Sequence, residues 1–158
     1  MENLKVDFSV SDAAFSGGVD AGLLIQESAR ACGIDINLIR EPNDSYWDNV
    51  WLKKPWALCY WGGRPVADMF MSVSLAADAA WNDTRWKNAR FNELLLAARA
   101  ETDDAKRAAM YAECQQLVHD DGGQVVLMYN NYVGALSTKI GHGDFNTDFD
   151  HDGRYMYE

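Results

Sequence analysis

The stretch from Leu4 to Leu38, LKVDFSVSDAAFSGGVDAGLLIQESARACGIDINL, decides the fold class of this chain. Apolar and polar residues alternate at a period of two from Leu4 to Val10, which is typical of a β-strand. A helical pattern then runs to Gly33, a natural helix stop, and a second alternation follows from Ile34 to Leu38. The helical face we expect to be buried consists of Ala21, Leu24, Ile25, Ser28 and Cys32. Strand, helix and strand in this order predict a βαβ unit with a parallel sheet.

The next part of the chain continues the alternation of helix and strand. Pro42 closes the second strand, and a helix with an apolar stripe of Trp47, Val50 and Trp51 should follow it. Residues Trp56–Trp61 form a nearly continuous apolar run, as expected of a strand covered on both faces, and Gly62 and Gly63 break this run. We expect a loop from this point.

Two helices and two strands are predicted in the second half. The first helix covers Arg90–Ala100, and the second starts at Thr102, Asp103 and Asp104, which can cap free amides, and ends at Gly122 and Gly123. Strand-like runs follow at Gln124–Tyr129 and Tyr132–Leu136. The resulting expectation is one α/β domain over residues 1–158. Its sheet is mostly parallel with helices on both faces, its ordered core covers residues 1–140, and residues 141–158 form a polar tail.

Composition excludes several classes of partner. The chain has 158 residues, of which 48% are hydrophobic and 24% charged, values of a globular protein. Its 24 acidic and 14 basic residues give a net charge of −10, which repels nucleic acid and anionic membrane surfaces. We find no apolar run long enough to span a bilayer, and Met1–Lys5 has no signal-peptide character.

The residues that usually carry catalysis or bind metals form no known constellation here. Cys32, Cys59 and Cys114 lack metal-type spacing, and we expect them to be buried free thiols. No hydrolase, protease or phosphate-binding motif is present, so we predict no catalytic residue, no metal and no cofactor. Residues 148–153 resemble half of a calcium loop, but the second half fails, and an unstructured acidic terminus is favoured.

A turn rich in aromatic residues and glycines is the main candidate for a ligand-binding site. In open α/β sheets, ligands bind beyond the carboxyl ends of the strands, where this turn should lie. An indole wall, close backbone amides and a forked cationic donor suit a small solute. These predicted contacts are Tyr60, Trp61, Gly62, Gly63 and Arg64. For Trp47, Trp51 and Trp56 we favour core packing, because their spacing already explains them.

A second candidate site lies at Trp81 and Asn82, followed by Asp83 and Thr84. An indole face beside an amide and a carboxylate suits a polar solute. A capped turn before the next helix explains the same residues equally well. We keep Trp81 and Asn82 as predicted ligand contacts alongside this structural alternative.

Several blocks of the sequence resemble the family 5 solute-binding proteins of ABC transporters, which include dipeptide, oligopeptide and nickel binders. The blocks occur in the family's order over about Val6 to Ala135. They are Arg40–Trp47, Tyr60–Pro65, Trp81–Thr84, Phe91–Leu95, Ala98–Glu101, Lys106–Arg107, Met110–Tyr111, Gln115 and the Gly122–Tyr132 strand.

The resemblance implies a function and a set of partners. Members of the family are bilobal clamps outside the inner membrane that close on a solute and present it to a permease. This chain resembles the C-terminal lobe of such a clamp, of the periplasmic-binding-protein type II fold. The resemblance implies a peptide-like or related small solute and an ABC permease as partners. It also implies a full protein with an N-terminal lobe and a secretion signal, and a periplasmic or extracytoplasmic location. A dimer through the exposed lobe interface is a further expectation.

One departure from the family concerns the ligand. Peptide binders of the family carry an aspartate at about the position of Arg64, where it pairs with the peptide's amino group. The reversed charge at Arg64 predicts an anionic group of the solute instead. Leu127, where the family commonly has proline, is a second departure without functional weight.

Two alternatives come from other functional classes. A small α/β hydrolase acting on a sugar or peptide would use an acidic pair near Trp81 to Asp83. A protein interaction module would expose a large apolar patch. Solute binding without catalysis remains the favoured hypothesis.

Overall fold

The computed structural model describes residues 4–131, 133, 135, 137–142 and 156–157. The chain divides into two compact units, one ending at Trp61 and the other beginning at Gly62. None of the helices in the described ranges is long and apolar enough to cross a membrane. The Asp148–Gly153 segment lies outside the described residues.

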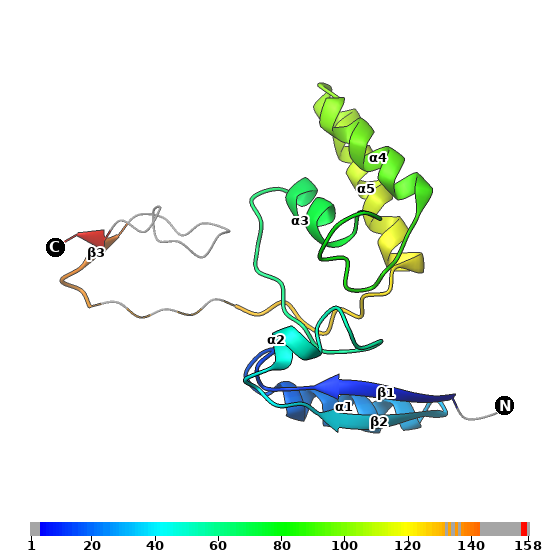
Figure 1. The fold of residues 1–158 in the computed structure, drawn as a ribbon. Helices are drawn as coiled ribbons and strands as arrows, with labels where there is room; N and C mark the ends of the chain where they lie inside the picture. Colours follow the sequence, from blue (N-terminus) through cyan, green and yellow to red (C-terminus); the bar gives the residue numbers. More distant parts are fainter. Residues whose placement is uncertain (1–3, 132, 134, 136, 143–155, 158) are drawn as a thin grey trace. The chain divides into compact units, whose positions relative to one another are not determined.

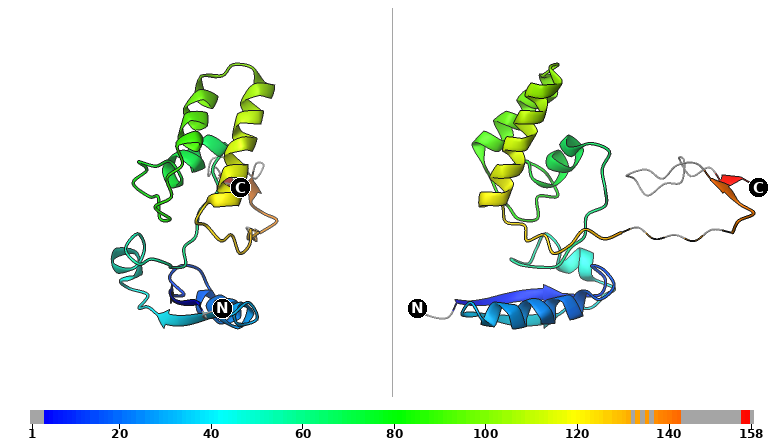
Figure 2. Two further views of the ribbon diagram at one scale, coloured as in Figure 1. Left: turned by 90° about the vertical axis from the view of Figure 1, so that its right-hand side faces the viewer. Right: turned by 180° about the vertical axis from the view of Figure 1, so that it is seen from behind.

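The first unit is built on the predicted βαβ motif. Strand β1 (Leu4–Val10) leads into helix α1 (Gly18–Arg30), which returns to strand β2 (Ile34–Arg40). The two strands are parallel, with Leu4 opposite Ile34 and Val10 opposite Arg40. Gly33 ends the connection at a φ of 77°, a left-handed conformation that glycine adopts without strain. Figures 1 and 2 show α1 running along the β1–β2 ribbon.

The face of α1 that packs on the sheet differs from the predicted face. Gly18 and Gly22 are buried and Ile25 packs against the core, whereas Leu24, Ser28 and Cys32 of the predicted face are exposed. A Cβ at Gly22 would lie 2.7 Å from Cγ1 of Val10, so the missing side chain lets the helix approach the sheet closely. The spacing of apolar residues did not predict this face, because a glycine is not counted as an apolar residue in such a pattern. The core of the unit consists of Phe8, Val10, Ala14, Ile36, Tyr46, Val50 and Leu58.

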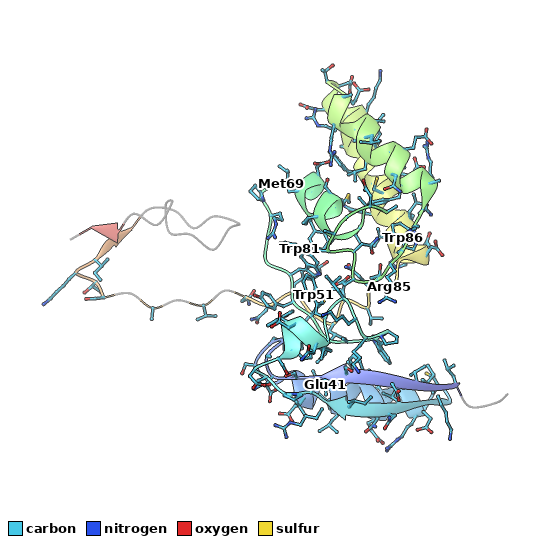
Figure 3. All side chains as sticks on the ribbon, in the orientation of Figure 1. Glu41, Trp51, Met69, Trp81, Arg85 and Trp86 are labelled. Atoms are coloured by element: carbon cyan, nitrogen blue, oxygen red, sulfur yellow. The ribbon has the colours of Figure 1, made fainter. Side chains whose placement is uncertain are left out.

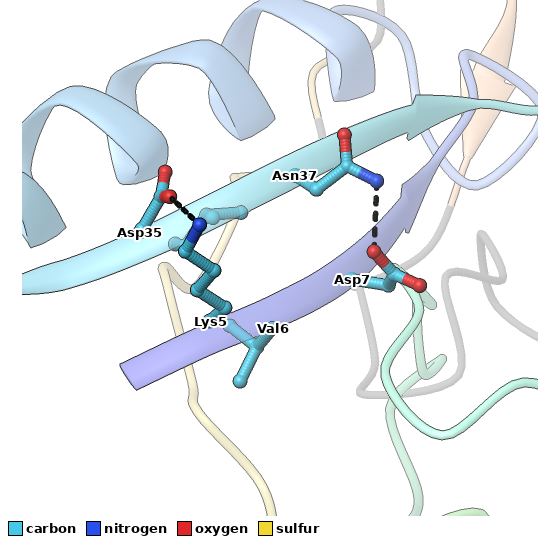
Figure 4. A pocket seen from close by; sticks show the side chains of 6 residues that line it. Lys5, Val6, Asp7, Asp35 and Asn37 are labelled. Atoms are coloured by element: carbon cyan, nitrogen blue, oxygen red, sulfur yellow. Dashed lines mark hydrogen bonds and ion pairs between the residues drawn. The ribbon is translucent and has the colours of Figure 1, made fainter. Parts of the chain in front are cut away.

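The opposite face of the sheet is polar. Lys5 and Asp35 form a cross-strand ion pair at 3.8 Å, and the Asn37 amide donates a hydrogen bond of 2.8 Å to the Asp7 carboxylate (Figure 4). These side chains line a shallow depression over the strands. The α/β fold class is confirmed. The described sheet of this unit is smaller than predicted, and α1 covers its apolar face.

The predicted third strand is reduced to a single bridge. Ala57 pairs with Ser9 in parallel, and the Trp56 ring stacks on Phe8 with centroids 4.1 Å apart. Trp56 therefore packs against the core, as predicted. The helix expected before this segment is the one-turn helix α2 (Tyr46–Asn49).

In the part of the second unit that the structure describes, there are three helices and a two-residue ladder. They are α3 (Ala67–Ser74), α4 (Ala89–Ala100), α5 (Asp104–Asp121), β3 (Gly141–His142) and β4 (Met156–Tyr157). Strands β3 and β4 pair antiparallel. The two predicted helices, α4 and α5, form a hairpin, and the views of Figures 1 and 2 show them side by side. Helix α3 was not predicted, because we expected a loop after Gly63.

Capping and burial explain the helical hairpin. The Asn88 and Asp103 side chains accept hydrogen bonds from the Phe91 and Lys106 amides and cap α4 and α5. The apolar core cluster of the unit comes from all three helices and the loops between them. Its members are Met71, Leu75, Ala76, Trp86, Phe91, Leu94, Leu95 and Cys114.

Polar contacts fasten α3 to the hairpin. The Asp68 carboxylate on α3 accepts hydrogen bonds from Arg99 Nε on α4 at 2.8 Å and from the Tyr111 hydroxyl on α5 at 3.3 Å. At the other end of the hairpin, the Trp86 indole donates a hydrogen bond of 2.9 Å to the Asp121 carboxylate.

The strand predicted at Gln124–Tyr129 is not formed. Residues 124–131 pair with no strand among the described residues, and their apolar side chains are exposed. A strand requires a partner edge, which an apolar run alone does not supply. Within the second predicted strand, Tyr132–Leu136, residues 132, 134 and 136 lie outside the described residues, and residues 133 and 135 are not in a strand.

Candidate functional site

Three segments of the first unit end at the same edge of its sheet. Strands β1 and β2 are parallel, so the loops that begin at Ser11 and Glu41 leave from one side. The segment from Trp56 runs along the other side of β1. Its Trp56 carbonyl accepts from the Ser9 amide at 3.0 Å, and its Leu58 amide donates to the Ser9 carbonyl at 3.1 Å. This edge is where an open α/β sheet usually binds its ligand.

Two serine hydroxyls fix the loop that follows β2. Ser9 donates a hydrogen bond of 2.8 Å to Oε1 of Glu41, and Ser11 donates one of 2.6 Å to Oδ1 of Asn43. Both serines are buried. The serine hydroxyls at the C-terminal end of β1 therefore hold the start of the loop that leads to α2.

Tyr46 joins α2 to the segment that carries the predicted site. Its side chain is fully buried, and its hydroxyl donates a hydrogen bond of 2.6 Å to the Leu58 carbonyl. Burial, followed by the nearby Cys59 and Glu41, raises the pKa of the Tyr46 phenol above its usual value, so the group stays a neutral donor. This bond places α2 beside residues 59–61.

Four aromatic side chains gather at this point of the first unit. Trp47 makes edge-to-face contacts with Trp51 and Tyr60, at centroid distances of 5.9 and 5.5 Å. Trp51 in turn contacts Trp61 at 6.3 Å, and Figure 3 labels Trp51 beside α2. We call Trp47, Trp51, Tyr60 and Trp61 the aromatic cluster. It offers flat apolar surface of the kind that contacts small solutes.

The aromatic cluster includes residues that the sequence reasoning placed in the core. Trp47 is 38% exposed and Tyr60 is 62% exposed, while Trp51 and Trp61 are half-buried. The prediction of core packing for Trp47 is therefore wrong. The four-residue spacing of Trp47 and Trp51 indicated one helical face, but α2 is a single turn and leaves Trp47 at the surface.

The glycine turn and Arg64 belong to the second unit. The half-buried Arg64 guanidinium donates from Nη1 to the carbonyl oxygens of Gly62, at 3.2 Å, and Gly63, at 2.9 Å. A guanidinium carries five N–H donors, and these two bonds use Nη1 alone, so donors on the other nitrogens can meet an anion.

Asn82 has a structural role in the second unit, whereas Trp81 beside it is exposed. The buried Asn82 amide donates to the carbonyls of Ala76, at 3.2 Å, and Trp86, at 2.7 Å. The Thr84 hydroxyl donates to its Oδ1 at 3.0 Å. These bonds match the capped-turn alternative. Trp81 is the member of this pair that can meet a ligand.

The cysteines and the other possible metal ligands form no reactive centre among the described residues. Among the described residues, no three His, Cys, Asp or Glu side chains gather as a metal site. Cys32 is exposed, Cys59 is half-buried and Cys114 is buried, so the prediction of three buried thiols holds for Cys114 alone. Burial raises the pKa of the Cys114 thiol, which lowers its reactivity.

No protein-family model matches this chain, and no curated protein matches it in sequence. Solved structures do match it, and they define a class. They are solute-binding proteins of ABC transporters with the periplasmic-binding-protein type II fold. The chain has the fold of part of these proteins.

The individual matches belong to the family 5 proteins that the sequence resembles. DppA from Helicobacter pylori, solved with the peptide STSA, has a TM-score of 0.66 and 21% identity over 77% of this chain. HbpA2 from Haemophilus parasuis has a TM-score of 0.64 and 17% identity over 77% of it. NikZ from Campylobacter jejuni, solved with Ni(L-His), has a TM-score of 0.63 and 15% identity over 75%. The chain spans about a quarter of each of these proteins, 24 to 25% of their length.

Proposed function

We propose that this chain is the C-terminal solute-binding lobe of an extracytoplasmic binding protein of an ABC importer, and that it binds its solute without transforming it. The aromatic cluster at the carboxyl edge of β1 and β2 carries the proposal. Its exposed rings lie where sheets of this class receive ligands. Among the structures with this fold, DppA is an ABC transporter-associated periplasmic binding protein solved with a peptide, and NikZ is solved with a nickel–histidine complex.

The proposal includes the partners that the resemblance implies. A clamp of two lobes encloses a solute from both sides, so one lobe supplies part of the binding surface. The N-terminal lobe of a full protein would supply the rest, and an ABC permease would receive the solute. Binding by the single lobe should be weak, with a dissociation constant of about 1 mM, which corresponds to a binding free energy of about −4 kcal/mol.

Quenching of tryptophan fluorescence tests the proposal, since the aromatic cluster holds three of the six tryptophans. The probes are the peptide STSA and the nickel–histidine complex, with chromatography of the recovered peptide to detect turnover. We expect weak saturable quenching by at least one probe, its loss in Trp61→Ala and an unchanged peptide. Leu23→Ala, at an exposed leucine on α1, is the control. Hydrolysis of the peptide, or micromolar binding by the single chain, would contradict the proposal.

The proposed anionic group of the solute concerns Arg64. A guanidinium favours a carboxylate over a neutral amide. We expect STSA to bind more tightly than its C-terminal amide, and Arg64→Ala to abolish this difference. Lys87→Ala removes an exposed cation elsewhere in the second unit and should preserve it. Equal preference in wild type and Arg64→Ala would refute the role of Arg64 and leave the solute-binding proposal standing.

A further inference from the structure

Glu41 lies at the carboxyl edge of the sheet in the first unit. It directly follows β2, and its backbone amide donates a hydrogen bond of 2.8 Å to the carbonyl of Val10, the last residue of β1. Figure 3 labels Glu41 at the strands, near α2. Its carboxylate therefore lies at the edge where an open α/β sheet usually binds its ligand.

The Glu41 carboxylate is fixed in place and keeps open acceptor positions. Its Oε1 accepts the 2.8 Å hydrogen bond from the buried Ser9 hydroxyl. No other side chain in the described ranges donates a hydrogen bond to this carboxylate. Because the two oxygens of a carboxylate offer about four acceptor positions, further donors can bind to Glu41.

Glu41 also differs in burial and pairing from the other acids of the first unit. It is half-buried, whereas all the other described acidic residues of this unit are exposed. No lysine, arginine or histidine in the part of the chain that the structure describes forms an ion pair with Glu41. A charge that is partly withdrawn from water is unfavourable without a counter-charge, so a cationic group of a ligand would be stabilised here.

Tyr46 connects this carboxylate to the aromatic cluster. After burial and Cys59, the negative charge of Glu41 contributes to the raised pKa of the Tyr46 phenol, so the carboxylate lies within electrostatic reach of that hydroxyl. The Tyr46 ring contacts Trp47 edge to face at a centroid distance of 5.5 Å, and Trp47 contacts Tyr60 at the same distance. Trp47 and Tyr60 are the exposed rings of the cluster. Aromatic rings near a carboxylate favour an organic cation, because ring faces also attract positive charge.

We propose that Glu41 binds a cationic group of the solute, of the primary ammonium type, beside the exposed rings of the aromatic cluster. This inference rests on the proposed solute-binding function and deepens it by naming a charge that the solute carries. An ammonium donates charge-assisted hydrogen bonds to a carboxylate. A metal ion fits less well, because no three His, Cys, Asp or Glu side chains gather among the described residues. The net charge of −10 favours the approach of a cationic solute.

Quenching of tryptophan fluorescence by the peptide STSA and by its N-acetylated form tests the proposal, because acetylation removes the ammonium charge. In wild type we expect acetylation to raise the dissociation constant at least about tenfold, the effect of losing a hydrogen bond between charged groups. Glu41→Gln keeps an oxygen that can accept from Ser9, and it should bind the two peptides equally. Glu27→Gln makes the same change at an exposed residue of α1 and should preserve the difference.

The possible outcomes separate this inference from the proposed function. Saturable quenching that acetylation leaves unchanged in wild type would overturn the role of Glu41 and leave the solute-binding proposal standing. A preference for STSA that persists in Glu41→Gln would overturn it equally, because the bulk of the acetyl group would then explain the difference. Equal weakening of both peptides by Glu41→Gln would show that Glu41 acts through the fold alone. Quenching by neither peptide would overturn the inference, and the solute-binding proposal too if the nickel–histidine complex also failed.

Discussion

Replacing Tyr46 with phenylalanine tests how the aromatic cluster is held. The change removes the hydroxyl that donates to the Leu58 carbonyl and keeps the ring that packs in the core. Leu58 is buried, so its carbonyl would be left without this donor. An unsatisfied buried polar group costs about 1–3 kcal/mol, and we expect this loss in the free energy of unfolding.

Urea denaturation followed by near-ultraviolet circular dichroism measures the effect, because the signal reports the ordered rings beside Tyr46. Tyr60→Phe makes the same chemical change at an exposed ring and should cost less than about 0.5 kcal/mol. Equal stabilities of the Tyr46→Phe and wild-type proteins would refute the reasoning.

The free energy of unfolding at alkaline pH provides a further check on Tyr46. Burial raises the pKa of its phenol above the unfolded value of about 10, so the folded state favours the neutral form. The stability linked to this group is complete below about pH 10 and is lost as the pH rises further. Tyr46→Phe should lack this part of the alkaline destabilisation, whereas Tyr60→Phe should retain it.

Two other substitutions or modifications test the packing of each unit. Gly22→Ala should destabilise the first unit by about 1–3 kcal/mol in chemical denaturation, because its Cβ would lie 2.7 Å from Cγ1 of the buried Val10; a neutral outcome would mean that α1 can shift. The exposed Cys32 should react rapidly with a thiol reagent in the native protein, whereas the buried Cys114, with its raised pKa, should react after unfolding. Rapid native labelling of Cys114 would contradict the described core of the helical hairpin.

The sequence predicted those elements whose pattern is local. Alternation in β1 and β2, the stop at Gly33 and the cap at Asp103 are read from adjacent residues, and the structure confirms them. Helix α3 escaped prediction because it is short and its buried Met71 packs against the hairpin, a contact between distant residues. The Val125–Tyr129 run shows the converse, since its composition favours a strand but pairing depends on another edge.

The local sequence pattern also accounts for part of the candidate site, whereas the rest depends on contacts between distant residues. Tyr60 and Trp61, the last residues of the predicted strand-like run, lie in the aromatic cluster. The contribution of Trp47 depends on the shortness of α2, and that of Tyr46 depends on a bond to Leu58. Neither dependence is visible in the spacing of apolar residues.

The bond between the Trp86 indole and the Asp121 carboxylate provides an internal optical probe. Trp86 precedes α4 and Asp121 ends α5, so separation of the two helix ends would break the bond and expose the ring to water. A buried indole emits at shorter wavelengths than a hydrated one. In a variant that retains Trp86 as its sole tryptophan, a red shift of emission would report opening of the helical hairpin without any added label.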